Sequence, residues 1–495
     1  SGAERYRGDV GVKNGRIVSL GVAPGDAYHT IDAGGMIVCP GFVDIHTHYD
    51  AQVMWDRMLS ISPWHGVTTA VLGNCGFGVA PTRPAHRDLI VRTLEKVEGM
   101  SVAALEAGLG KNWPFQTFPE FLDAIETRGV AINVGVLIGH TPVRLWVMGE
   151  AATERAATVD EIAEMKSIVR GAIEAGAIGF ATSKASTHVG YGGRPVPSRV
   201  ADLGEIKALA GALGEAGRGI MQATIGKELF LDEFVEICRA TGRPITWTAL
   251  LAGLSFGVGD HLEQLARSEA IAAEGLMIVP QVTPRPLNFE YQFKAPFPFE
   301  PLSLFKPVSA ADTASKAHIY ADPEFRRAFA ERLLTSGPPT FRATFAKTVV
   351  GQYAPERELE ERLLFDVARE RGVLPTDLAL DMALRTALEA RFRMPVANHD
   401  ENEVELLLKS ACTVLGLSDA GAHAGQLCDA CLPTYLLGHW VREKGVFSLE
   451  EGVRMLTSRP AEVFGLEDRG RVALGAPADL VVFDPATIGA GKLRR

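Results

Sequence analysis

Short apolar runs alternate with amphipathic stretches along most of the chain. Runs of this length are typical of strands buried on both faces, as in a parallel sheet. The candidate strands are residues 38–45, 67–73, 131–139, 177–182, 219–224, 244–250, 276–281 and 412–418. Eight parallel strands joined by crossover helices are the number that closes a barrel. The pattern therefore predicts an α/β protein built on a (β/α)8 TIM barrel.

The stretches between these runs have helical spacing, and one of them has clear end signals. Thr158 and Glu161 match a capping box. Apolar residues then recur at helical intervals from Ile162 to Ile173, and Gly176 follows as a stop signal. We expect a helix here, between the third and fourth strands.

The two ends of the chain have a different pattern, with short alternating strands and turn signals. The Asn14-Gly15 pair is a strong hairpin signal in the first segment. The last segment contains similar short apolar runs. We expect the two ends to pair into one small sheet, so the predicted domains are a small β domain of residues 1–37 and 467–495 and a barrel of residues 38–466.

Residues 283–357 interrupt this alternation. The stretch is rich in proline and aromatic residues, as at Phe297-Pro298-Phe299 and Pro338-Pro339. It is too long for a simple connection. We interpret it as an insertion on the catalytic face that could cover the site. A second long excursion, from Pro81 to about Pro119, follows the second strand.

Composition narrows the class of protein. The chain has 495 residues, 47% apolar and 22% charged, which is ample for a large core. Its net charge of −10 and the lack of a Lys/Arg run argue against a nucleic-acid partner. No apolar run approaches the roughly 18 residues of a membrane span, and no signal-peptide pattern is present. Six cysteines in a chain of this length favour a reducing compartment over a disulfide scaffold.

From this composition we expect a cytoplasmic protein that acts on a small-molecule substrate, without a nucleic-acid or membrane partner. The sequence leaves the oligomeric state open, including a homo-oligomer. It begins at Ser1 rather than methionine, directly before strand-like sequence. The natural N-terminus and any targeting segment therefore also stay open.

Candidate chemistry gathers at the ends of the strands. The first strand ends in His46-Thr47-His48, and residues i and i+2 of an extended chain point to the same side. Two converging imidazoles are half of a metal site, and the alternative is a pair of partly buried histidines in a turn. Cys75 follows the second strand, where its thiol could reach the same ion. Other polar side chains follow later strands: His140, Lys184, Asp419 and His423.

Taken together, several segments resemble the amidohydrolase superfamily and, within it, the N-acyl-D-amino-acid deacylases (D-aminoacylases). The segments that carry the resemblance are Gly41–His48, Gly66–Thr69, Asn74–Phe77, Gly139-His140, Asp419 and Gly475–Asp484. The resemblance runs nearly end to end. It implies a metal-dependent barrel with a small β-sandwich formed by the chain ends, and hydrolysis of an amide C–N bond.

The resemblance also implies roles for individual residues. By position, the metal ligands are His46, His48, Cys75 and Asp419, and Asp419 is also the proton shuttle. The family usually adds a histidine at the ends of strands five and six, but residues 221–225 and 246–250 contain none. The chain therefore looks like a divergent member, which binds either one zinc ion or a second ion through substitute groups.

Other candidates have alternative roles. Lys184 could be carboxylated, as in other superfamily branches, or be an ordinary or substrate-facing lysine. His423 could bind or orient a ligand, and His140 could support the ligands or stabilise an oxyanion. The C-x-x-C of Cys428 and Cys431 lacks a partner pair, so we interpret it as a loop near the site. Three histidines in polar or connecting sequence are expected at the surface: His188, His318 and His399.

The ligand set predicts the chemistry. A divalent metal, zinc above all, would activate water and polarise a carbonyl group. Asp419 would take the water's proton and deliver it to the leaving nitrogen. An arginine should receive a substrate carboxylate, and each of three candidates is alternatively structural: Arg144, Arg199 and Arg285.

The leading hypothesis is a hydrolase of an N-acyl amino acid or a related amide. A second hypothesis keeps the metal and changes the substrate to a cyclic amide, a lactone or a deaminase-type substrate, since strands five and six are altered. A third is a non-catalytic binding protein, and the retention of His46, His48 and Asp419 argues against it.

Overall fold

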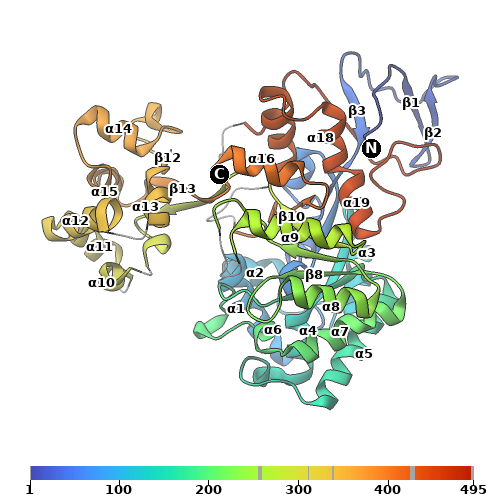
Figure 1. Cartoon of the computed structure of the whole chain (residues 1–495), viewed down its shortest axis with the longest axis horizontal. Coiled ribbons are helices and arrows are strands. Elements are labelled where there is room, and N and C mark those ends of the chain that lie inside the picture. The colour runs from blue at the N-terminus through green and yellow to red at the C-terminus, as the bar shows by residue number, and fades with distance from the viewer. Residues whose placement is uncertain are drawn as a thin grey trace. The chain divides into compact units, whose positions relative to one another are not determined.

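The computed structural model describes residues 2–254, 259–300, 302–309, 311–336, 339–423 and 430–491 (Figure 1). The chain divides into two compact units. Unit 1 contains Ser1–Arg285, Asp400–His423 and Asp429–Arg495, and unit 2 contains Pro286–His399 and Ala424–Cys428.

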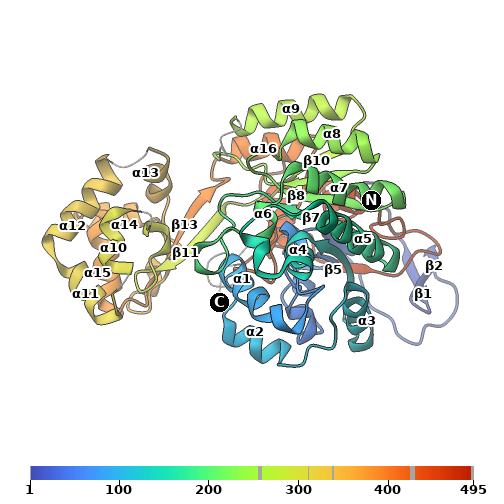
Figure 2. The ribbon, with the colours of Figure 1, turned by 90° about the horizontal axis from the view of Figure 1, so that it is seen from below.

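Unit 1 is built around eight parallel strands that follow one another around a curled sheet (Figure 2). They are β4 (Phe42–Asp44), β5 (Val67–Leu72), β6 (Asn133–Gly139), β7 (Gly179–Ser183), β8 (Ile220–Thr224), β9 (Ile245–Thr248), β10 (Ile278–Val282) and β14 (Val414–Leu415). Just beyond the first and last strands, Thr47 and Ala420 form a parallel bridge that joins the two edges. The predicted barrel class is confirmed, and each of these strands overlaps one of the predicted apolar runs.

Helices lie outside this sheet and bury their apolar faces against it. They are α1 (Arg87–Glu98), α2 (Val102–Leu109), α3 (Phe118–Arg128), α4 (His140–Met148), α5 (Val159–Ala175), α6 (Pro197–Val200), α7 (Leu203–Ala216), α8 (Leu231–Thr241), α9 (His261–Ala273), α16 (Glu401–Lys409), α17 (Leu432–Tyr435), α18 (Leu449–Leu456) and α19 (Ser458–Phe464). The predicted capping box is present at α5, where Thr158 and Glu161 cap each other's backbone N–H groups. The helix predicted between Thr158 and Gly176 is therefore confirmed.

The barrel interior changes from apolar to polar along the strands. Val43, Val71, Ile220 and Val279 belong to one buried apolar cluster. Because side chains on a strand alternate, Gln222 and Gln281 share the inner face with Ile220 and Val279, two residues nearer the C-terminal ends. Both glutamines are fully buried. The polar end of the interior is thus the C-terminal edge, where barrel enzymes place their active sites.

The two chain ends form small antiparallel pairs. β1 (Asp9–Lys13) and β2 (Arg16–Gly21) form a hairpin, and Asn14 and Gly15 have the positive φ values of 51° and 72° that a tight hairpin turn requires. β3 (Ile37–Pro40) pairs with β15 (Leu480–Phe483). The expected pairing of the two ends is present between β3 and β15 and at the bridge of Arg16 with Pro477. The expectation of one small sheet is wrong, because β1 and β2 form a separate sheet. The boundaries of a separate β domain stay a prediction.

The prediction of a single first strand over residues 38–45 is wrong, because two strands occupy this range. β3 pairs with β15, and the barrel strand β4 begins only at Phe42. Between them, the backbone of Gly41 approaches β5 so closely that a Cβ atom would lie 1.9 Å from Thr68 Oγ1. Only glycine fits this crossing from one sheet to the other without displacing β5.

Unit 2 has a core of its own, made largely of aromatic side chains such as Phe293, Phe299, Phe329 and Phe392. Its antiparallel sheet has the order β11 (Leu287–Gln292), β13 (Arg391–Ala397) and β12 (Val349–Gln352). Its helices are α10 (Lys306–Ser309), α11 (Thr313–Ala321), α12 (Pro323–Ala330), α13 (Pro339–Ala346), α14 (Leu364–Arg371) and α15 (Pro375–Arg385).

The start of unit 2 lies near that of the predicted insertion, residues 283–357, but the unit continues to His399. The physical reason is β13, which forms the middle of the unit 2 sheet although it comes last in the sequence. A role as a cover over the catalytic face stays a prediction.

Among the described residues, no helix combines the length and the apolar character that crossing a membrane would need.

Close packing of β7 against β8 gives a testable prediction. A Cβ atom at Gly179 would lie 2.0 Å from the carbonyl oxygen of Ile220, which is backbone and cannot move cheaply. We expect Gly179→Ala to lower the free energy of unfolding by about 1–3 kcal/mol. The matched control is Gly171→Ala in α5, where no described atom lies within 4 Å, and it should raise the free energy of unfolding by about 0.5–1 kcal/mol. Urea denaturation measures both, and equal effects would contradict this packing.

Candidate metal centre

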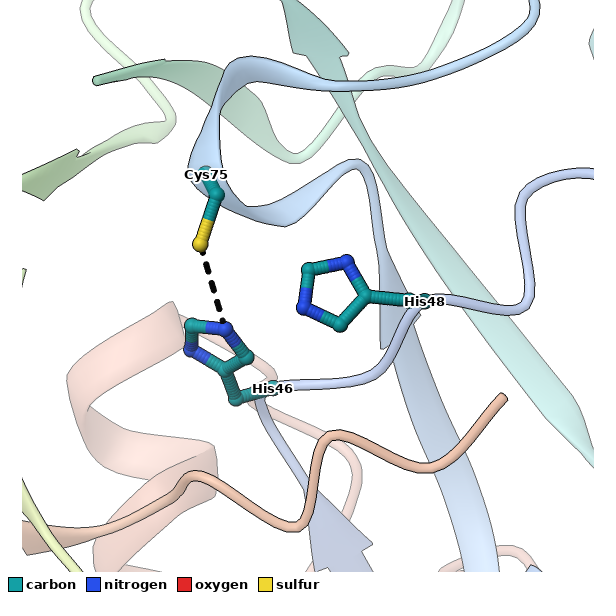
Figure 3. A group of neighbouring side chains, drawn as sticks. All are labelled: His46, His48 and Cys75. Carbon is teal, nitrogen blue, oxygen red and sulfur yellow. Dashed lines mark hydrogen bonds between the residues drawn. The ribbon is translucent and has the colours of Figure 1, made fainter. Parts of the chain in front are cut away.

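Three buried side chains converge at the C-terminal edge of the barrel (Figure 3). His46 and His48 lie just beyond β4, and Cys75 lies in the turn that follows β5. Their ligand atoms all lie within 4.8 Å of one another, and the Nε2 atom of His46 is 3.5 Å from Cys75 Sγ. Two imidazoles and a thiol are donors that zinc prefers. The structure thus brings together three of the four residues predicted as metal ligands.

Asp419, the fourth predicted ligand, faces the same two imidazoles. Its Oδ1 atom is 3.4 Å from His46 Nε2 and 3.7 Å from His48 Nε2. Burial acts to raise the pKa of Asp419, but the hydrogen bond with His48 and the charges of the two imidazoles outweigh it and hold that pKa well below its usual range. Asp419 therefore presents an anionic carboxylate toward the Nε2 atoms.

The contact between the first and last barrel strands explains why these groups meet. The hydroxyl of Ser418 lies 2.6 Å from Asp44 Oδ2 and 3.0 Å from the carbonyl oxygen of His46. The backbone N–H of His46 donates to Asp44 Oδ1, and that of Asp419 donates to the carbonyl oxygen of His46. Burial raises the pKa of Asp44 to about 6. These bonds fix the histidine segment against the aspartate segment.

The outer nitrogen of each imidazole faces a side-chain oxygen, through a hydrogen bond for His46 and an ion pair for His48. His46 Nδ1 lies 2.7 Å from Gln281 Oε1, and His48 Nδ1 lies 3.1 Å from Glu98 Oε1. An imidazole that donates from Nδ1 keeps its Nε2 lone pair for a metal. The Nε2 atoms are the ones that face Cys75 and Asp419, so both rings have the orientation of a metal ligand.

Sequence reasoning missed Glu98 and Gln281. Gln281 ends the seventh predicted strand, so a search for polar residues at strand ends would have found it. Glu98 lies at the end of α1, on the same face as the buried residues Ile90, Val91 and Leu94. An acidic residue at helical spacing on an apolar face was the available signal.

The turn at Cys75 is held by a residue of β8. Cys75 has a φ of 57°, which is unusual outside glycine, and its backbone N–H donates to Gln222 Oε1 at 2.7 Å. Burial acts to raise the pKa of the Cys75 thiol, but the charge and hydrogen bond of His46 and His48 lower it to about 7. A substantial thiolate population at neutral pH follows, and thiolate is the form that binds metals.

Where the family resemblance leads us to expect two further histidines, the structure has neutral groups that bond within the protein. Gln222 uses its amide oxygen on the backbone of Cys75. The hydroxyl of Thr246 donates to the carbonyl oxygen of Val279, and that of Thr248 donates to Thr224 Oγ1. These groups replace imidazole nitrogens with weaker oxygen donors for zinc.

His140 and Arg144 belong to a separate buried group around Glu205. His140 lies 2.8 Å from Thr182 Oγ1 through Nδ1 and 2.8 Å from Glu205 Oε1 through Nε2. Arg144 pairs with the other oxygen of Glu205 and donates to the carbonyl oxygen of Arg155. Both ring nitrogens of His140 are engaged within the protein, which favours support of the strand ends over the predicted catalytic contact. For Arg144, full burial and pairing with Glu205 argue against the predicted substrate contact.

Lys184 and Arg199 lie beyond β7, at the same edge of the barrel. Lys184 Nζ donates to the carbonyl oxygens of Arg199 and Ala201 at 2.8 and 2.7 Å. A carboxylated lysine would turn anionic oxygens toward these carbonyls, so the arrangement favours the free amine. The guanidinium of Arg199 donates to the carbonyl oxygen of His188 at 3.0 Å and is partly exposed.

His188, expected at the surface, is only partly exposed. Its Nδ1 atom is 2.7 Å from Ser183 Oγ, and its ring packs against Phe77 at a centroid distance of 5.1 Å. Burial lowers the pKa of His188 to about 4. Its loop folds back over the end of β7, which no local sequence pattern indicated. His318 is exposed as expected, whereas His399 is partly buried.

His423 lies beside the end of α1, where its backbone N–H donates to the carbonyl oxygen of Glu98 at 2.7 Å. Among the described residues, the group of convergent ligand atoms does not include His423. The geometry therefore favours an orienting role over direct ligation.

Arg285 is buried beside α17. Its Nη1 atom is 2.5 Å from Cys431 Sγ, and its guanidinium lies 5.5 Å from the ring centroid of Tyr435. Cys428, the other cysteine of the C-x-x-C motif, lies outside the described residues.

Comparison with known proteins assigns the family. The model of the amidohydrolase family matches residues 29–276 and 339–494. This chain belongs to the amidohydrolase family, as its sequence predicted. It is therefore a metal-dependent hydrolase that acts on C–N bonds.

Several relatives match this chain over nearly its full length. D-aminoacylase from Alcaligenes xylosoxydans xylosoxydans is 29% identical, over 97% of this chain and 85% of the relative. A crystal structure of N-acyl-D-glutamate deacylase from Bordetella bronchiseptica, complexed with zinc and a phosphonate inhibitor, matches with a TM-score of 0.64 and 27% identity, covering 99% of this chain and 88% of that one. A structure of D-aminoacylase that concerns the functional role of its binuclear metal centre matches with the same TM-score and identity, covering 99% and 89% of the two chains.

The thiol offers the first test of the metal centre. We expect Cys75→Ser to weaken zinc binding by more than about 100-fold, since loss of a ligand should cost more than the 10–100-fold that loss of a supporting residue costs. The matched control is Cys238→Ser, a buried cysteine of α8 outside the convergent group, which should bind zinc like wild type. Competition with a chromophoric chelator measures both affinities. Equal zinc affinity in Cys75→Ser and wild type would show that the thiol is only nearby.

Proposed function

We propose that this protein hydrolyses the amide bond of N-acyl amino acids, with D-amino acid derivatives as its main substrates, and that it uses one zinc ion. The observation that carries the proposal is the convergence of two imidazole Nε2 atoms, a thiol and a carboxylate at the catalytic edge of an amidohydrolase barrel. The names of the relatives support the substrate class.

The residues fit a zinc ion held by His46, His48, Cys75 and Asp419. Both imidazoles have acceptors at Nδ1, which leaves Nε2 free to coordinate. A thiolate and a carboxylate together carry two negative charges, which balance a divalent cation. The donor types are those that zinc selects.

The mechanism assigns proton transfer to Asp419. A divalent ion bound at this site supplies Lewis acidity, which lowers the pKa of a water molecule and polarises the scissile carbonyl group. Asp419 accepts a proton of the attacking water on a carboxylate oxygen as the water oxygen bonds to the carbonyl carbon, and it donates that proton to the leaving nitrogen as the C–N bond breaks, so that the amine departs in neutral form. The backbone N–H of Asp419 donates to the carbonyl oxygen of His46, which holds the aspartate beside the ligands.

A single ion is proposed because the ends of β8 and β9 offer only amide and hydroxyl groups. Gln222, Thr246 and Thr248 are neutral, and each already bonds within the protein. A second zinc ion would lack the imidazoles that would hold it tightly. In this respect the chain differs from the D-aminoacylase whose structure contains a binuclear centre.

For a substrate carboxylate, we propose Arg199 and Lys184 as the receiving cations. Both follow β7 at the catalytic edge, and Arg199 is partly exposed. Arg285 is the alternative, although it is buried beside Tyr435. The cytoplasmic location and the oligomeric state stay predictions.

The role of Asp419 is tested by Asp419→Asn. An amide has similar shape but cannot accept the water's proton, so we expect turnover to fall by about 10²–10⁴-fold while most zinc stays bound. The measurement pairs steady-state kinetics with metal analysis of the same preparation. Asp123→Asn, an exposed position of α3, is the control and should keep wild-type turnover. Undiminished activity in Asp419→Asn would remove this residue as proton shuttle.

Metal removal tests the proposed function as a whole. We expect chelator treatment to abolish hydrolysis of N-acyl-D-amino acids and one molar equivalent of zinc to restore it, because one set of donors is complete. N-acyl-L-amino acids, cyclic amides and lactones should be poorer substrates.

Wild-type protein that retains no divalent metal would contradict the proposal. Restoration that requires two equivalents would contradict the single site. A preference for a cyclic amide or a lactone would instead support the second hypothesis.

A further inference from the structure

We infer that Gln281 and Glu98 are positioning residues that keep Nδ1 of His46 and His48 turned toward their own side chains, so that Nε2 is the nitrogen each ring presents to the ion. Gln281 does this as a neutral acceptor and Glu98 as an anionic one. The inference rests on the proposed function, because it concerns the same site.

The orientation of the Gln281 amide follows from a chain of hydrogen bonds. The hydroxyl of Thr246 has one hydrogen, which it donates to the carbonyl oxygen of Val279 at 3.0 Å. Its oxygen is therefore the acceptor for Gln281 Nε2, at 3.2 Å. This places the amide oxygen of Gln281 toward His46 Nδ1, at 2.7 Å. An amide oxygen only accepts, so Nδ1 must carry the proton.

That proton settles the form of the neutral His46 ring. With Nδ1 protonated, the lone pair lies on Nε2, which faces Cys75 Sγ at 3.5 Å and Asp419 Oδ1 at 3.4 Å. Gln281 is fully buried on β10, so solvent cannot replace it as acceptor. The strand pairing of β10 with β9 thus determines which nitrogen of His46 is free.

Glu98 acts on His48 in the same way but with a charge. Its carboxylate lies 3.1 Å from His48 Nδ1, at ion-pair distance but without hydrogen-bond geometry, and its negative charge favours a proton on that nitrogen. Glu98 is 1% exposed, and within the described chain its carboxylate forms an ion pair with His48 and has no hydrogen-bond partner. Its carbonyl oxygen accepts from the backbone N–H of His423 and so ties the end of α1 to the loop that carries Asp419.

Because Gln281 is neutral and Glu98 is anionic, the imidazoles of His46 and His48 should differ in strength as metal donors. A carboxylate behind an imidazole makes the ring a stronger base than an amide does, and such partners raise metal affinity. His48 should therefore be the stronger of the two imidazole donors. Removing the charge of Glu98 should weaken zinc binding even when an acceptor remains at that position. Replacing the neutral acceptor of Gln281 by a charged one should not weaken zinc binding.

The test uses the full chain and zinc itself, in four variants and two controls. Gln281→Leu removes the acceptor, and Gln281→Glu keeps one. Glu98→Leu removes acceptor and charge, and Glu98→Gln removes the charge alone. The controls are Gln264→Leu, a buried glutamine of α9 that bonds to the carbonyl oxygen of Gly259, and Glu95→Gln, one turn earlier on α1.

We expect Gln281→Leu and Glu98→Leu to weaken zinc binding by about 10–100-fold, and Glu98→Gln to weaken it by about tenfold. Gln281→Glu should bind zinc at least as tightly as wild type. Both controls should bind zinc like wild type. The absorption spectrum of the cobalt(II)-loaded protein should shift in Gln281→Leu and Glu98→Leu and be restored in Gln281→Glu. Thermal melting of the metal-free proteins identifies a variant that fails to fold. If a leucine variant fails to fold, the conservative variant at the same position, Gln281→Glu or Glu98→Gln, tests the inference.

Zinc affinity and cobalt spectra that match wild type in all folded variants would overturn the inference, while the proposed function would stand. If wild type itself binds no zinc, the proposed function fails first. Failure of the inference and failure of the proposed function can be told apart, because zinc affinity and the cobalt spectrum are measured without turnover.

Discussion

The site depends on the bond network that joins the first barrel strand to the last. Asp44 accepts from the backbone of His46 and bonds to Ser418, and the backbone of Asp419 donates to His46. These residues are far apart in the sequence, and only closure of the sheet brings them together. Because Asp44 and Ser418 are buried, water cannot replace their bonds. Closure of the barrel and assembly of the metal centre are therefore one structural event.

Around this contact, each convergent donor is held by a side chain from another element. Gln281 of β10 supports His46, Glu98 of α1 supports His48, and Gln222 of β8 holds the backbone of Cys75. Buried acids and amides cost free energy unless they are paired. The apolar core of the barrel and its helices must offset that cost. The donors are thus arranged by the fold, in a geometry that a bound ion can stabilise further.

Patterns that act over a few residues predicted much of this architecture. The parallel strands, the α5 capping box and the Asn14-Gly15 hairpin each depend on local chemistry, and so does the placing of two histidines on one side of a strand end. What the sequence could not show depends on contacts between distant segments. Arg144 looked available for a substrate because its burial against Glu205 has no sequence signature, and Glu98 reaches His48 only because α1 packs against the barrel's edge.

The central claim is that one zinc ion binds at the end of β4 and β5, between His46, His48, Cys75 and Asp419. Diffraction from zinc-soaked crystals, recorded on either side of the zinc absorption edge, tests it most directly. We predict one anomalous peak for each chain, about 2.0–2.1 Å from both Nε2 atoms and about 2.3 Å from Sγ. A peak bound through Nδ1, two peaks in the barrel, or a peak outside this group would contradict the account.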